Sequence, residues 1–189
     1  GVNYQDSTES SRTSARTRGL PQSITVDTAG ADDATGSWIG GTWYTATLGT
    51  SRVTPSSIQT QMVSGNATLQ TAGAITISSP VTAGTSRALT LTSTGSNIAL
   101  NGSVSGLASF QATCNSGNFS SNASGSVSAS GAVSVQCQTI TAAAAIQTAG
   151  NISLSGSGNL TANANVTSSS GSVSPVSYTH LRAHETVLD

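Results

Sequence analysis

The stretch that decides the fold is residues 73–106, GAITISSPVTAGTSRALTLTSTGSNIALNGSVSG, where apolar residues alternate with Ser, Thr or Asn between short Gly-containing turns. Its apolar positions return along the chain at a step of about 23 residues, within the range of known structural repeats. The resulting columns are Leu91, Cys114, Cys137 and Leu160; Val81, Val104 and Val127; Ile77, Leu100, Ala123 and Ile146; Leu89, Ala112 and Val135; Ile75 and Ile98; Phe110 and Val133. Such a step is typical of a solenoid, because each coil buries its inward side chains only against neighbouring coils.

The alternating segments read as short strands, two or three in each repeat. They are Thr68 to Gln70, Ala74 to Ser78, Ala88 to Thr92, Asn97 to Asn101, Ala132 to Gln136 and Asn151 to Ser155. The repeat is too long for a hexapeptide helix and lacks the Asp-rich turns of calcium-binding nonapeptides. We therefore predict an all-β fold, a parallel β-helix of about 23 residues per coil over residues 56–175.

The N-terminal third follows a different pattern. Residues 1–22 carry most of the charge and read as a flexible linker, and residues 23–55 read as an irregular strand and aromatic region in which Ile24 and Val26 alternate. Residues 56–65, SSIQTQMVSG, predict one or two helical turns that end at Gly65. The apolar residues at helical spacing are Ile58, Met62 and Val63. Trp38, Trp43 and Tyr44 are expected to cap the end of the core, with carbohydrate stacking as the alternative.

Composition excludes several classes of function. The chain has six Arg, no Lys and a formal net charge of −1, so no basic face predicts nucleic-acid binding. No apolar run approaches the roughly 20 residues of a membrane span, so we expect no membrane insertion by this segment. The chain starts at Gly1, and we expect it to be a fragment of a longer protein.

Catalytic groups are also missing from the repeats. Ala88 to Pro175 contains no ionisable side chain apart from two thiols, so no other side chain there can act as a general acid or base. We therefore expect no enzyme and no cofactor. The cluster of Asp27, Asp32 and Asp33 is explained by a turn or a solvated loop. His180, His184 and Glu185 have zinc-compatible spacing, but they fall in an atypical tail, so we predict no metal site.

Cys114 and Cys137 stand one repeat apart, which would place their Cα atoms about 4.8 Å from each other in adjacent coils. Two interpretations remain open, a pair of buried thiols that act as small hydrophobic residues and a disulfide. Asn-x-Ser/Thr sequons occur at Asn66, Asn101, Asn118, Asn122, Asn151, Asn159 and Asn165. We interpret most of them as chance in a chain so rich in Ser and Thr.

Residues 56–106 resemble the secreted β-helical passengers of the filamentous-haemagglutinin type, in which a short helical turn leads into coils of alternating Ile and Leu. The matching positions are Ile75, Ile77, Val81, Leu89, Leu91, Ile98, Leu100, Asn101, Gly102 and Val104. The resemblance covers rather more than half of the chain and weakens after Phe119. It implies a right-handed β-helix, export, and adhesion or scaffolding at a bacterial surface. The family's N-terminal secretion motif is not visible.

A second resemblance concerns residues 176–186, VSYTHLRAHET, which are similar to the translation of a transposase-type sequencing adapter. This stretch breaks the composition of everything before it. We therefore expect residues 176–189 to be an unstructured read-through artefact that does not continue the ladder.

The leading hypothesis is a non-catalytic structural and adhesive segment of a secreted bacterial surface protein. Its expected partners are neighbouring coils and a host-cell surface, matrix or carbohydrate. The first alternative is a carbohydrate-binding or carbohydrate-processing β-helix whose active coils lie outside this segment. The second is a disordered, glycosylated, mucin-like wall protein.

Overall fold

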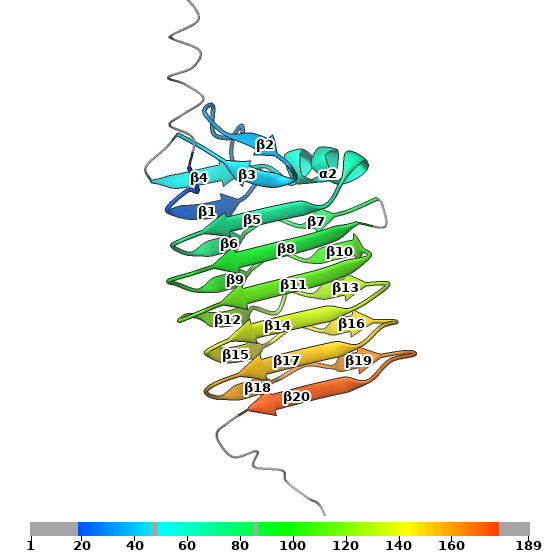
Figure 1. The fold of residues 1–189 in the computed structure, drawn as a ribbon. Coiled ribbons are helices and arrows are strands. Elements are labelled where there is room, and N and C mark those ends of the chain that lie inside the picture. Colours follow the sequence, from blue (N-terminus) through cyan, green and yellow to red (C-terminus); the bar gives the residue numbers. More distant parts are fainter. Residues whose placement is uncertain (1–18, 47–48, 85–86, 178–189) are drawn as a thin grey trace, which may run out of the picture.

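The computed structural model describes residues 19–46, 49–84 and 87–177. It is an all-β protein with 52% strand and 6% helix, built as a β-solenoid of about five turns (Figure 1). Each full coil contributes one strand to each of three sheets, and all pairings between coils are parallel. The predicted fold class is confirmed, and an ordered solenoid argues against the disordered mucin-like alternative.

The three sheets are named here by their order along a coil. The first sheet contains the coil strands β5 (Ala67–Thr71), β8 (Ala88–Ser93), β11 (Ser109–Cys114), β14 (Val133–Cys137), β17 (Ile152–Gly156) and β20 (Val173–Ser177). The second sheet contains β6 (Ile75–Ile77), β9 (Ile98–Leu100), β12 (Asn118–Ser121), β15 (Thr139–Ala142) and β18 (Leu160–Ala162). The third sheet contains β7 (Val81–Thr82), β10 (Val104–Leu107), β13 (Val127–Ala129), β16 (Ile146–Thr148) and β19 (Val166–Ser168).

The step between coils varies, and the fixed step that the sequence predicted is wrong as a general rule. Phe110 pairs with Val133 at the predicted interval, but Leu89 pairs with Phe110 and Val133 with Ile152 at shorter intervals. Coils lie about 21 residues apart on average. Parallel pairing constrains the strands but not the turns between them, so residues are gained or lost at the corners without disturbing the ladder.

The predicted columns are corrected accordingly. The structure confirms the following alignments: Val81 with Val104 and Val127, Ile75 with Ile98, Phe110 with Val133, Cys114 with Cys137, Ile77 with Leu100, and Ala112 with Val135. Leu91 instead pairs with Ala112, and Leu160 with Ile140, so neither shares a column with the cysteines. Leu89 pairs with Phe110, Leu100 with Ser121, and Ile146 with Val127. Ala123 is exposed, because it lies in a turn after β12.

The core is a narrow apolar column enclosed by the three sheets. Leu69, Ile75, Leu91, Ile98 and Val104 are all 0% exposed. Each large aliphatic side chain contributes about 1.5–3 kcal/mol when it is removed from water. Alternation along each strand therefore places apolar residues inside and Ser, Thr, Gln or Asn outside.

The N-terminal end of this column is covered by non-repeating structure (Figure 1). Strands β1 (Ser23–Val26) and β4 (Thr50–Val53) extend the second sheet in parallel beyond β6. The antiparallel hairpin of β2 (Ser37–Ile39) and β3 (Thr42–Tyr44) extends the first sheet beyond β5. Helix α2 (Pro55–Ser64) packs against β7.

The predicted helix is confirmed, but it begins at Pro55 rather than at Ser56, and Val63 does not lie on its buried face. Its N-cap is Thr54, whose hydroxyl accepts a hydrogen bond from the Ser57 amide at 3.2 Å, and Pro55 occupies the first turn. Gly65 ends the helix as expected. Ile58 and Met62 are buried, but Val63 is 69% exposed. Val63 follows Met62 directly, and a step of one residue turns it away from the buried face.

The C-terminal coil runs slightly further than expected. In β20, Val176 pairs with Ser155 and Ser177 with Gly156, so the ladder continues two residues past Pro175 and the prediction is wrong for these two. The rest of the tail, including His180, His184 and Glu185, lies outside the described residues. In the described parts of the chain, no helix has the length and hydropathy needed to span a membrane.

Candidate functional site

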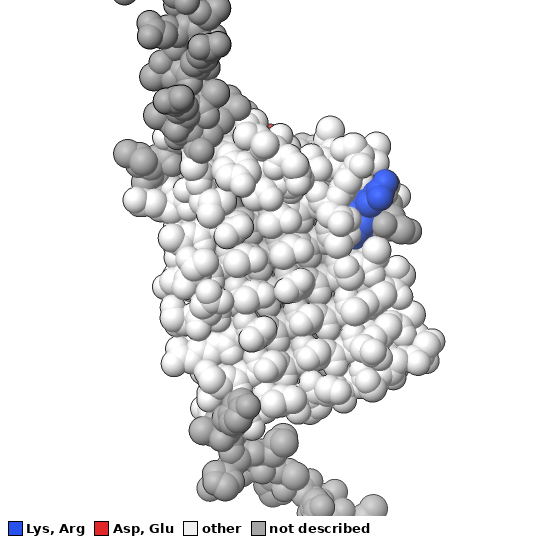
Figure 2. Space-filling model, viewed as in Figure 1, with Lys and Arg blue, Asp and Glu red and all other residues white. Residues whose placement is uncertain are grey.

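The outer surface of the first sheet is a set of neutral polar rows. One row aligns Thr68, Thr90, Gln111, Ser134, Ser153 and Ser174 in register, and a second aligns Gln70, Thr92, Thr113, Gln136 and Ser155. Rows of like neutral residues avoid the repulsion that stacked charges would create. Figure 2 shows this face almost free of charge, with one basic patch at its edge.

Buried or half-buried hydroxyls join the coils where the first sheet ends. Thr71 donates to the carbonyl of Pro21 at 2.6 Å, Ser93 to that of Gly73 at 2.7 Å, and Ser177 to that of Gly158 at 2.7 Å. A second corner repeats the arrangement, since Ser168 donates to the Gly150 carbonyl at 2.7 Å and Thr148 to that of Gly131. These bonds satisfy turn carbonyls that have no ladder partner.

A disulfide between Cys114 and Cys137 occupies the same corner position as Ser93 and Ser177. The two Cα atoms lie 4.4 Å apart, and the residues are 2% and 4% exposed. Of the two interpretations that the sequence left open, the structure has the disulfide. A covalent bond therefore joins β11 to β14 at the position where other coils use a hydroxyl.

A groove of about 400 Å³ runs beside the disulfide across three coils. Its lining consists of Thr113, Cys114, Asn115, Gln136, Cys137, Gln138, Ser155, Gly156 and Ser157. The lining is neutral and rich in amides and hydroxyls. Sequence reasoning did not single out Asn115, Gln136 or Gln138; the available signal was that an amide residue follows each cysteine.

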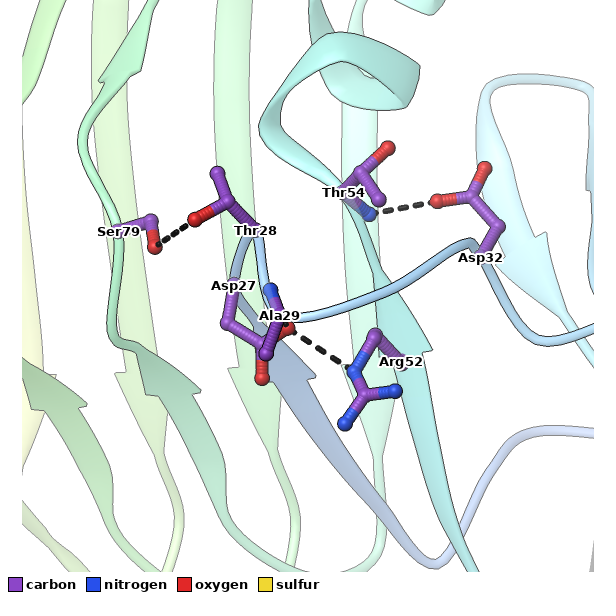
Figure 3. Close-up of polar contacts among 7 residues, drawn as sticks. All are labelled: Asp27, Thr28, Ala29, Asp32, Arg52, Thr54 and Ser79. Carbon is purple, nitrogen blue, oxygen red and sulfur yellow. Dashed lines mark hydrogen bonds and ion pairs between the residues drawn. The ribbon is translucent and has the colours of Figure 1, made fainter.

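The N-terminal aspartates form structural contacts with the non-repeating segments at the end of the core, and Figure 3 shows those of Asp27 and Asp32. Asp27 forms an ion pair with Arg52 at 2.9 Å and also accepts the Ala29 amide at 3.1 Å. Asp32 accepts the Thr54 amide at 2.6 Å, which connects the loop to the start of α2. Within the described residues, no group of three or more His, Cys, Asp or Glu side chains is arranged to hold a metal ion.

Asp33 holds the loop to the first sheet. Its carboxylate accepts hydrogen bonds from the Thr35 amide at 3.0 Å and from the Thr45 hydroxyl at 2.7 Å. Of the turn or solvated loop that the sequence suggested, the short-range contacts of Asp27 and Asp33 fit the turn, and all three aspartates are half-buried.

The aromatic residues cover the end of the core. Trp43 is 2% exposed and donates its indole N–H to Ser51 at 2.9 Å, so its ring face is not available to a glycan. Trp38 is half-buried, meets Trp43 edge-on at 5.3 Å between ring centroids, and donates to Ser57 at 3.0 Å. Tyr44 is also half-buried. The burial of Trp43 thus fits the capping role that was expected of the three aromatic residues rather than the alternative of carbohydrate stacking.

The sequon asparagines are exposed, and several have a structural use. Asn66 accepts the amide of Ala88 at 3.0 Å, Asn151 that of Ser172 at 3.0 Å, and Asn118 the hydroxyl of Thr139 at 2.6 Å. Each of these bonds reaches the next coil. The need for such side-chain acceptors explains these asparagines without glycosylation.

No family model, curated protein or solved structure matches this chain.

Proposed function

We propose that this chain is a non-catalytic, structural and adhesive segment of a secreted protein at a bacterial cell surface. The observation that carries the proposal is the neutral outer face, which repeats hydrogen-bonding side chains in register over successive coils. A surface of this kind offers many weak, identical contacts rather than one reactive centre.

Export is supported by the disulfide, because disulfides form and persist in oxidising compartments and are rare in the cytosol. The β-solenoid fold is consistent with a structural and adhesive role. Because the sequence of residues 56–106 resembles the filamentous-haemagglutinin type, we propose that kind of passenger as the parent protein. The groups needed for acid–base chemistry are missing from residues 88–177.

Extending the gene in both directions tests the proposed parent protein. We expect further neutral coils and an export domain. A neighbouring coil with paired carboxylates in a cleft would instead favour the carbohydrate-processing alternative.

A binding assay tests the adhesive role. The oxidised chain, displayed on beads, is expected to retain beads on cultured epithelial cells and on extracellular matrix. Beads carrying a designed β-solenoid with charged outer rows serve as the matched control. Equal retention of both beads would refute the proposal.

We also propose that residues 176–186 derive from a sequencing adapter rather than from the native gene. Resequencing the source with a different library chemistry should replace them. Recovery of the same residues would refute this origin.

A further inference from the structure

The groove beside the disulfide combines features of a binding site. It is concave, holds about 400 Å³ and extends over the ends of β11, β14 and β17 and the residues that follow them. That volume lies within the range of ordinary small-molecule sites. Successive coils repeat at about 4.8 Å, so an elongated ligand laid along the solenoid axis meets an equivalent side chain at each coil.

The chemistry of the lining specifies a neutral, hydroxyl-rich ligand. Asn115, Gln136 and Gln138 are exposed, and no side-chain hydrogen bond joins them to other described residues. A carboxamide offers two donors and an acceptor, and the hydroxyls of Thr113, Ser155 and Ser157 offer both roles as well. A sugar hydroxyl also donates and accepts, so each hydroxyl of a bound sugar can form hydrogen bonds with side chains of the lining.

The neutral lining argues against charged ligands. Anionic groups such as phosphate, sulfate and uronate are bound by Arg, Lys or helix N-termini, and the lining has none of these. Cationic ligands require carboxylates or aromatic rings, which the lining also lacks. A neutral saccharide remains the ligand class that the groove fits.

The disulfide holds the groove in a fixed shape. Asn115 and Gln138 each follow one of the bonded cysteines, whose Cα atoms lie 4.4 Å apart, so the bond restrains the relative position of the two amides. Restraint before binding lowers the entropy that is lost when a ligand is bound.

We propose that this groove, lined by Asn115, Gln136 and Gln138, binds a neutral saccharide chain along the solenoid axis. The inference rests on the proposed adhesive function and gives it a ligand class and a place. It requires no catalytic group and no metal.

The test is a titration of the oxidised, ¹⁵N-labelled chain with cellohexaose and, separately, with mannohexaose, followed through the side-chain NH₂ signals. We expect saturable shifts of the Asn115, Gln136 and Gln138 signals with at least one of these sugars. The double variant Gln136→Ala/Gln138→Ala is expected to weaken that affinity at least tenfold. Both residues are exposed, so the urea midpoint should stay at the wild-type value.

The matched control is Gln147→Ala, which removes an exposed glutamine from β16 on the third sheet. Its affinity should stay within twofold of the wild-type value. No saturable shift at millimolar sugar, or equal weakening in the control and the double variant, would overturn the inference. Binding of polygalacturonate in preference to the neutral sugars would overturn it as well.

The bead assay separates this inference from the proposed function. Sugar binding without bead retention supports the groove and refutes adhesion. If no sugar binds and the double variant retains beads as well as the wild-type chain does, the proposed saccharide site is refuted and the adhesive role remains supported.

Discussion

Removal of the Cys114–Cys137 bond is expected to destabilise the solenoid by about 3 kcal/mol. The cysteines are 23 residues apart, and closing a loop of that length removes roughly 11 cal/mol/K of entropy from the unfolded chain. Because small domains are stable by only about 5–15 kcal/mol, this is a large share of the total. With a urea m-value of about 1–3 kcal/mol/M, the midpoint should fall by roughly 1–3 M.

The assay is urea unfolding of the chain with and without reductant, followed by circular dichroism in the β region. Cys114→Ala/Cys137→Ala is the matched variant, and reductant should not change its midpoint. Mass spectrometry after alkylation reports whether the purified wild-type chain contains free thiols. A wild-type midpoint that reductant leaves unchanged would refute the reasoning, since the bond would then contribute nothing to stability.

Three further outcomes are expected. The double variant Cys114→Ser/Cys137→Ser should be more stable than the Ala double variant by about 1 kcal/mol for each hydrogen bond that the new hydroxyls form. The reason is that Ser93 and Ser177 in the same column each donate to a turn carbonyl. Equal urea midpoints of the two double variants would contradict this. Leu100→Asp should abolish the β signal, since it places a carboxylate at a position that is 0% exposed, whereas Asn101→Asp on the adjacent exposed turn should fold normally. Thr54→Ala should cost about 1 kcal/mol in urea unfolding through loss of the N-cap bond to Ser57, and an unchanged midpoint would argue against that cap.

Much of the fold could be predicted because a solenoid repeats its buried positions. The alternation of β8 and β9, and the columns through Val104 and Ile98, were visible as spacing alone. Register beyond these coils was not predictable from a fixed step. Turn lengths differ from corner to corner, and two columns can contain the same residue types. For this reason a fixed step aligned Leu91 with Cys114, whereas its partner in the structure is Ala112.

The candidate site was only partly predictable. The proximity of Cys114 and Cys137 followed from spacing, but the choice between thiols and a disulfide required their relative geometry. Trp43 illustrates the same limit, since an aromatic ring in a Gly-rich segment can cover a core or face a ligand. The burial of Trp43 at the end of the core decides between the two roles.

The sequence by itself determined the class of fold, the absence of charge from the coils and the lack of catalytic groups in them, because these depend on composition and on short-range periodicity. Only the tertiary structure decided which residues stack in each column and which polar side chains converge. Gln136 and Ser155 lie side by side in the groove lining because parallel strands from successive coils pair with each other. That pairing depends on turn lengths and on backbone hydrogen bonds between distant segments, neither of which is encoded in the local pattern of any one coil.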